Sequence, residues 1–152
     1  MKTAVFIGHS ECYGLSDEQL TNTIIKCINE GVTVFLNGGQ GGFDRKCALA
    51  VFKLKNIFPQ IKNVLVIPCL TFNVFDKDIF DEIIFPENFE NYHFKAAIPK
   101  RNKYMVNHSD IAICCINHGW GNAVKTYEYA QNKNLKIINL SNYSLSGLRP
   151  KE

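Results

Sequence analysis

The chain has 152 residues, a length that suits one domain and argues against two. Its 46% hydrophobic and 20% charged residues indicate a packed globule and exclude a disordered chain. A net charge of +3 is too small to predict nucleic-acid or membrane-surface binding through bulk charge, so neither partner is expected. No apolar run approaches the roughly 18 residues of a membrane span, and the first run is too short for a signal peptide. We therefore expect a cytoplasmic protein.

The six cysteines do not have the spacing of a disulfide framework or a metal site. Five of them lie inside apolar segments, where a free thiol behaves as a small hydrophobic side chain: Cys27, Cys47, Cys69, Cys114 and Cys115. No CxxC pair occurs, and the four histidines show no ligand spacing. The sequence predicts reduced cysteines, no metal and no cofactor.

Short apolar runs alternate with helical patterns along the chain, and no repeat or linker interrupts them. The runs predict strands over 4–7, 32–36, 63–70, 111–116 and 135–140, with a short strand over 83–85. Helices are expected from a capping box at Ser16 and Gln19 to a left-handed cap at Gly31, and over 43–54, 100–107 and 122–131. Residues 1–140 form the expected domain, and 141–152 are expected to be a loose polar tail.

This alternation predicts a three-layer α/β, Rossmann-like fold with a mainly parallel sheet in a single domain. Ligands of such folds collect at the carboxyl ends of the strands. Three polar, glycine-bearing loops are expected there, at 8–10, 38–44 and 118–122. We therefore look for function in these three loops.

The second loop has the sequence Asn-Gly-Gly-Gln-Gly-Gly-Phe-Asp over 37–44. Its glycines allow positive φ and a close approach of the backbone to a ligand, and amides at a helix start attract phosphate oxygens. It is neither a GxGxxG fingerprint nor a Walker A loop. The candidate ligand-binding residues are Gly38, Gly39, Gln40, Gly41, Gly42 and Asp44. The alternative is a tight turn that needs glycine only for its geometry, with Asp44 as a helix cap.

The third loop, 118–122, repeats this pattern after the fourth core strand. Asn122 is a good N-cap, and the glycines open the start of the helix to a second anion or a base edge. Trp120 gains little burial between two glycines, so it serves as a lid, stacks on a nucleobase or closes a subunit interface. The candidate residues are His118, Gly119, Trp120, Gly121 and Asn122.

The first loop contributes Gly8, His9 and Ser10. The His9 and Ser10 side chains are able to hydrogen-bond a hydroxyl or a phosphate. A histidine with no carboxylate partner in the sequence is more often structural than catalytic, and no nucleophile–base pair follows from the spacing.

The order of these motifs resembles the YpsA-like branch of the SLOG superfamily, from residue 4 to about 140. The resemblance rests on Gly8-His9, the 37–44 run, Val66-Ile67-Pro68, the 101–110 run RNKYMVNHSD, and Gly119-Trp120-Gly121-Asn122. It implies a nucleotide or nucleotide-derived ligand held by the glycine loops, and it adds Arg101, Asn102 and Met105 to the candidate binding residues. The more distant LOG phosphoribohydrolases and the DprA-type proteins belong to the same superfamily.

The LOG pattern implies an N-glycosidic hydrolase with a catalytic arginine and glutamate. Arg101 matches the arginine, but Lys125 stands where the glutamate is expected. Cleavage of an N-glycoside needs a carboxylate beside the ribose, and a lysine has the opposite charge. Glu128, one helical turn further on, is the remaining catalytic candidate, and its alternative is an ordinary surface residue.

Two functions therefore compete. The chain binds a nucleotide or an NAD-derived, cyclic ADP-ribose-type molecule without turnover, as a sensor subunit or a sequestering protein. The alternative is a LOG-like nucleoside monophosphate phosphoribohydrolase that uses Glu128, Asp44 or His9. The exposed Trp120 and the aromatic segment 72–94 predict a homodimer or larger homo-oligomer.

Overall fold

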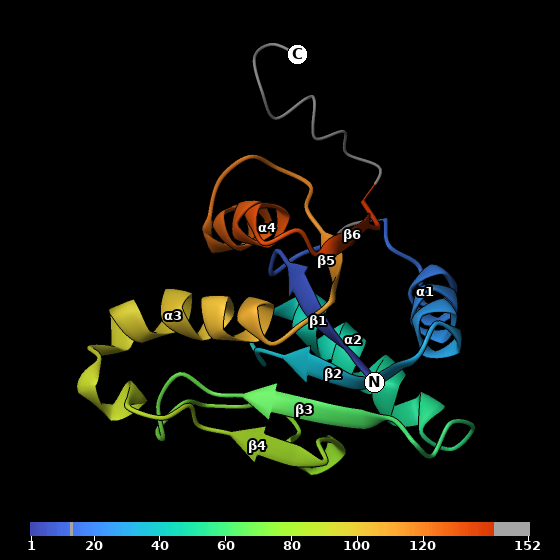
Figure 1. The fold of residues 1–152 in the computed structure, drawn as a ribbon, viewed down its shortest axis with the longest axis horizontal. Coiled ribbons are helices and arrows are strands. Elements are labelled where there is room, and N and C mark those ends of the chain that lie inside the picture. The colour runs from blue at the N-terminus through green and yellow to red at the C-terminus, as the bar shows by residue number, and fades with distance from the viewer. Residues whose placement is uncertain (13, 142–152) are drawn as a thin grey trace.

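A computed structural model of the chain describes residues 1–12 and 14–141. Six strands form one sheet in the order β4-β3-β2-β1-β5-β6, and every pairing is parallel (Figure 1). The strands are β1 (Lys2–Gly8), β2 (Val32–Asn37), β3 (Lys62–Val66), β4 (Glu82–Ile84), β5 (Ile111–Cys115) and β6 (Lys136–Asn139). The helices are α1 (Asp17–Asn29), α2 (Gly42–Leu54), α3 (Phe94–Asn107) and α4 (Asn122–Asn132), with short 3-10 turns η1 (Lys77–Ile79) and η2 (Phe89–Asn91). The predicted fold class is confirmed.

The side chains of β1 alternate between two hydrophobic cores, because successive residues of a strand face opposite sides of the sheet. Ala4 and Phe6 join the core under α1 and α2. Val5 and Ile7 join the core under α3 and α4. The sheet is therefore covered on both faces, as expected for a parallel sheet with apolar strands (Figure 1).

The order of the strands reverses at β1. From β1 the chain adds β2, β3 and β4 on one side, and it then crosses over to add β5 and β6 on the other. The register pairs Gly8 with Cys115, so β1 and β5 end at the same level. Loops that diverge at such a point leave a crevice at the carboxyl edge of the sheet.

Two predicted boundaries differ from the structure by more than two residues. The third helix begins at Phe94 and not at Lys100, because the His93 side chain accepts the Lys95 amide and Pro99 is accommodated inside the helix. A proline usually marks a helix boundary, which hides this start from the sequence. The third strand ends at Val66, since Ile67 already bonds the Ile84 carbonyl beyond the ladder.

The predicted helix caps are confirmed only in part. The Ser16 hydroxyl accepts the Gln19 amide, as expected of an N-cap. The Gln19 side chain does not complete the capping box but donates to the Leu140 carbonyl. Gly121, and not Asn122, is the N-cap of α4. The predicted tail falls, apart from its first residue, outside the described residues.

The prediction of reduced cysteines was wrong for one pair. Cys12, in the loop after β1, forms a disulfide with Cys115 at the end of β5, and their Cα atoms are 6.4 Å apart. The two residues are 103 positions apart in the chain, and only the parallel pairing of β1 with β5 brings them together. Cys27, Cys47, Cys69 and Cys114 are free thiols.

Candidate functional site

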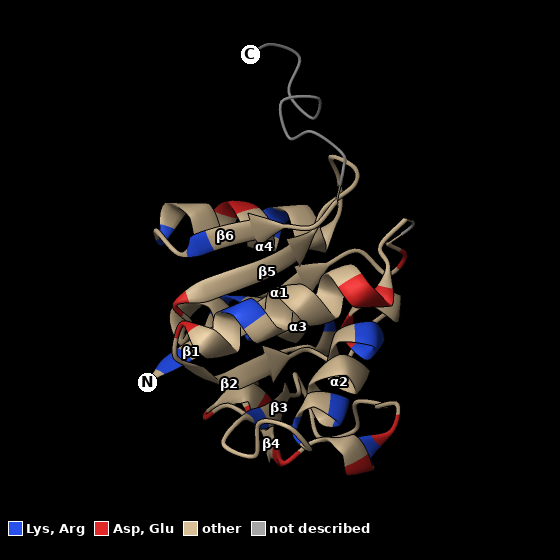
Figure 2. Cartoon of the chain, turned by 90° about the vertical axis from the view of Figure 1, so that its right-hand side faces the viewer, with Lys and Arg blue, Asp and Glu red and all other residues tan. Residues whose placement is uncertain are grey.

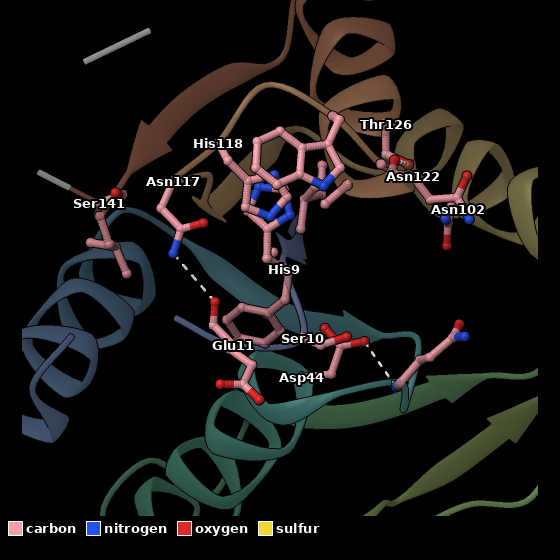
Figure 3. Close-up of a pocket in the computed structure, with 18 of the residues that line it drawn as sticks. His9, Ser10, Glu11, Asp44, Asn102, Asn117, His118, Asn122, Thr126 and Ser141 are labelled. Carbon is pink, nitrogen blue, oxygen red and sulfur yellow. Dashed lines mark hydrogen bonds between the residues drawn. The ribbon is translucent and has the colours of Figure 1, made fainter. Parts of the chain in front are cut away.

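A cavity of about 980 Å³ lies at the carboxyl ends of β1 and β5, where the strand order reverses (Figure 3). All three predicted loops contribute to its wall, together with one face of α3. From the predicted set it is lined by Gly8, His9, Ser10, Gln40, Asp44, Arg101, Asn102, Met105, His118, Trp120, Gly121 and Asn122. Gly38, Gly39, Gly41, Gly42 and Gly119 do not line it. The structure thus gathers most of the expected residues around one space.

The loop between β2 and α2 is closed by bonds within the protein. The Asn37 side chain clamps it by accepting the Gly39 amide at 2.7 Å and donating to the Asp44 carbonyl at 2.8 Å. The Gly42 amide donates to the Ser10 carbonyl at 2.7 Å. The Gln40 amide donates to the Asp44 carboxylate at 3.0 Å. Three amides expected to face an anion are therefore already occupied.

Arg101 holds this loop from the opposite side. Its side chain is buried, and its Nη1 donates to the carbonyls of Gly38 at 2.7 Å and Val66 at 3.0 Å. Nη2 donates to Gln40 Oε1 at 2.9 Å, and Nε donates to Asn102 Oδ1 at 2.8 Å. Burial lowers the pKa of Arg101 to about 10, so the group stays cationic at neutral pH. Arg101 anchors the loop, although its side chain also forms part of the cavity wall.

Asp44 is a buried carboxyl group in the floor of the cavity. Burial raises its pKa to about 7, against the opposing effects of the Gln40 amide and the Arg101 charge. The group accepts a backbone amide in its loop and does not act as the N-cap of α2, which is Gly41. A carboxyl group that titrates near neutral pH is able to donate or accept a proton there.

The loop between β5 and α4 is open. Its N-cap, Gly121, has φ 101° and ψ 175°, close to the 93° and 175° of Gly41. A methyl group on Gly121 would meet nothing within 4 Å, whereas one on Gly41 would lie 2.9 Å from the Cα of Ser10. Within the described residues no side chain caps α4, and Gly121, Asn122 and Ala123 line the cavity. The first-turn amides, which have no partner inside the helix, and the positive end of the helix dipole thus border the cavity.

Three rings form a continuous stack beside this helix start, and Figure 3 labels its two histidines, His9 and His118. The centroids of His9 and His118 are 3.5 Å apart, and those of His118 and Trp120 are 3.8 Å apart. The indole is 70% exposed, so one of its faces is free. Nε2 of His9 and Nδ1 of His118 are buried without a hydrogen-bond partner among the described residues. Burial, and then the nearby His118, lower the pKa of His9, which favours the neutral ring.

The family of the chain follows from a comparison with protein-family models. The YpsA model, described as "YspA SLOG family", matches residues 4–151. The chain belongs to the YpsA SLOG family. This confirms the resemblance drawn from the glycine loops and the 101–110 run. Membership supports a nucleotide- or nucleic-acid-related role and no finer function.

Two solved structures share the fold of this YpsA-family chain at low sequence identity. DNA processing protein A from Helicobacter pylori, described with a single-stranded DNA binding mode, has a TM-score of 0.62 and 14% identity over 90% of this chain. DNA processing protein A (DprA) from Streptococcus pneumoniae has a TM-score of 0.68 and 15% identity over 97%. The chain spans 63% and 53% of their lengths. No curated protein matches the chain.

The candidate catalytic residue lies outside the cavity. Glu128 is exposed and lines a second groove, between α3 and α4. Within the described residues, the carboxyl groups that line the cavity belong to Glu11 and Asp44. Lys125, at the position of the LOG glutamate, lines the same second groove. Lys125 and Glu128, one helical turn apart, therefore both lie on the side of α4 that faces the second groove, and neither lines the cavity.

Some residues that line the cavity were not among those predicted from the sequence. Ile98 precedes the predicted start of the third helix, and it continues the face formed by Arg101, Asn102 and Met105 at helical spacing. Asn117 donates to the Glu11 carbonyl at 3.3 Å and so joins the first and third loops (Figure 3). Thr126 lies one turn beyond Asn122, a spacing that the predicted helix already contained.

The described residues contain no group of three or more His, Cys, Asp or Glu side chains placed to hold a metal ion. No described helix is long and apolar enough to cross a membrane. Trp120 and, within the aromatic segment, Ile83, Tyr92 and Phe94 are exposed. The homo-oligomer stays a prediction.

Proposed function

We propose that the cavity binds a nucleotide-like small molecule and holds a phosphate group at the start of α4. The observation that carries this proposal is the uncapped first turn of α4, which faces a cavity of about 980 Å³. Backbone amides and the helix dipole favour an anion at such a position. The unpartnered, buried Nε2 of His9 in the same wall gives independent support, because buried polar atoms normally have a partner.

The base of the nucleotide stacks on Trp120. The indole rests on His118 and is 70% exposed, so it offers a flat, supported aromatic face at the mouth of the cavity. Stacking of a base on an aromatic side chain contributes about 1–3 kcal/mol and tolerates any base. A ligand with a phosphate at the helix start and a base on the indole is a nucleotide or a nucleotide derivative.

Binding proceeds without turnover in this proposal. Lys125 replaces the carboxylate that the LOG pattern requires, and Glu128 lies in another groove. An NAD-derived molecule of the cyclic ADP-ribose type combines phosphate and base, and it is the finer candidate. A protein that holds such a molecule unchanged serves as a sensor subunit or sequesters its ligand.

Isothermal titration calorimetry against AMP, ADP-ribose, cyclic ADP-ribose and NAD tests the proposal. We expect one of them to bind, to quench the fluorescence of the single tryptophan and to be recovered unchanged after denaturation. Absence of binding by all four would refute the proposal. Recovery of a free base would replace it with the second candidate.

The second candidate is cleavage of an N-glycosidic bond, with Asp44 and not Glu128 as the proton donor. It is favoured by one observation: the Asp44 carboxyl lines the cavity and its pKa is raised to about 7. A group of this kind is able to protonate a departing base near neutral pH. Release of adenine from AMP that is lost in Asp44→Asn and kept in Glu128→Gln supports this reaction. Release that survives Asp44→Asn excludes it.

A further inference from the structure

A second groove, of about 360 Å³, lies between α3 and α4 and adjoins the cavity. Asn102, Asn122 and Thr126 line both spaces. These polar side chains form a ridge with the open helix start on one side and the groove on the other. We name this space the α3–α4 groove; besides the ridge it is lined by Pro99, Lys103, Lys125, Glu128, Tyr129 and Asn132.

The helices that form the groove concentrate the positive charge of the molecule. α3 contains four cationic residues and no acid, and α4 adds one lysine and one glutamate. The two helices therefore carry four net positive charges, more than the +3 of the whole chain. Arg101 is buried and already bonded, so the remaining cations of α3 are lysines at its surface.

Five other cations of the described residues form ion pairs, and they are Arg45, Lys46, Lys55, Lys62 and Lys136. On the opposite face of the sheet, α1 and α2 carry both signs of charge close together (Figure 2). Neither Lys103 nor Lys125 forms an ion pair with a described residue, and Glu128 is the one acidic side chain that lines the groove in the part of the chain described.

The Tyr129 ring keeps cationic groups beside the groove. Nζ of Lys103 lies 5.2 Å from the centroid of the ring, and Nζ of Lys133 lies 5.4 Å from it. The hydroxyl of Tyr129 donates to Asn107 Oδ1 at 2.9 Å, which fixes the ring against α3. Cation–π contacts of this kind hold ammonium groups in place without neutralising their charge.

We infer that the α3–α4 groove binds a second phosphate-bearing unit of the same ligand, so that a phosphodiester-linked dinucleotide is preferred over a mononucleotide and over the cyclic ADP-ribose type named above. The inference rests on the proposed function, which places the first phosphate at the start of α4. From there the ligand passes over Asn102 and Asn122, whose amide groups are able to bond a sugar or a phosphate. Its second phosphate then meets Lys103 and Lys125.

Calorimetric titration with AMP and with the 5′-phosphorylated dinucleotide pApA tests this inference. The first variant is Lys103→Ala/Lys125→Ala, and its matched control is Lys26→Ala/Lys53→Ala, which removes two exposed lysines from α1 and α2. We expect the unchanged chain to bind pApA at least about tenfold more tightly than AMP, since the second phosphate adds ionic contacts. The first variant should lose this preference and keep its affinity for AMP, while the control keeps both.

Each contrary result has a distinct meaning. Equal affinity of the unchanged chain for AMP and pApA overturns the dinucleotide inference and leaves the proposed function intact. An equal loss for both ligands in Lys103→Ala/Lys125→Ala overturns it as well, because it shows general electrostatic attraction. Binding of neither ligand refutes the proposed function together with the inference. Both lysines are exposed, so thermal unfolding should be the same in all three proteins.

Discussion

The two glycine-rich loops start their helices with the same backbone geometry, but one loop is closed by hydrogen bonds within the protein and the other is open to the cavity. Gly41 and Gly121 are both N-caps with φ near 100° and ψ of 175°. Around Gly41 the amides are taken up by Asn37, Asp44 and Ser10. A methyl group placed on Gly121 would meet no atom of the described residues within 4 Å. The local backbone geometry therefore exposes amides that are able to bind an anion. Contacts from segments distant in the sequence determine whether those amides stay free for a ligand.

Removal of the Arg101 anchor gives the largest expected effect. Arg101→Leu leaves the carbonyls of Gly38 and Val66 and the Gln40 side chain without their donor. Buried groups that lose a partner cost about 1–3 kcal/mol each, so the free energy of unfolding should fall by roughly 3 kcal/mol or more. Urea denaturation measures this loss. Lys103→Leu, an exposed control on the same helix, should change it by less than about 0.5 kcal/mol. A similar loss in both variants contradicts the anchoring role.

The next effect depends on pH. The pKa of Asp44 is raised to about 7 in the folded protein, from 3.8. Between these values the folded state binds the extra proton, so Asp44 lowers stability as pH rises, by up to about 1.4 kcal/mol per unit. Asp44→Asn should therefore gain stability relative to the unchanged chain from pH 5 to 7 and level off above. Asp78→Asn, an exposed control, should show no such trend. Parallel profiles for Asp44→Asn and the unchanged chain rule out the raised pKa.

Alanine at the two N-cap glycines compares the loops directly. Both positions have a backbone conformation that only glycine adopts easily, so each substitution should cost about 1–3 kcal/mol of strain. Gly41→Ala also brings a methyl group to 2.9 Å from the backbone of Ser10, which should add about 1–3 kcal/mol. Chemical denaturation of the two variants measures the difference. Equal losses would mean that the first loop is not closed against Ser10.

The effect of Trp120→Ala should appear in binding and hardly in stability. Its side chain is 70% exposed, so the free energy of unfolding should change by less than about 0.5 kcal/mol. Loss of stacking should weaken AMP binding about tenfold, and Trp120→Phe should restore most of the affinity. Unchanged affinity in Trp120→Ala would remove the indole from the site.

The sequence predicted the parallel α/β fold and the three loops, because apolar runs and glycine turns are local signals. It could not predict that Arg101 would fill the space beside Gly38, since 63 residues separate them. For the same reason the disulfide between Cys12 and Cys115 was missed. The sequence alone could have shown that Glu128 lies outside the cavity. Helical spacing places Thr126 on the same side of α4 as Asn122, and it turns Glu128 to a different side.

Replacement of Asn122 by aspartate tests whether a phosphate binds at the start of α4. Asn122 is the first residue of α4, where a carboxylate favours the helix dipole by about 0.3–1 kcal/mol. The same charge should repel a phosphate at this helix start. Calorimetric titration of AMP into the unchanged chain and into Asn122→Asp, with thermal unfolding of both, separates the two effects. We expect Asn122→Asp to be at least as stable as the unchanged chain and to bind AMP at least about tenfold more weakly. Equal or tighter binding of AMP by Asn122→Asp would contradict this expectation.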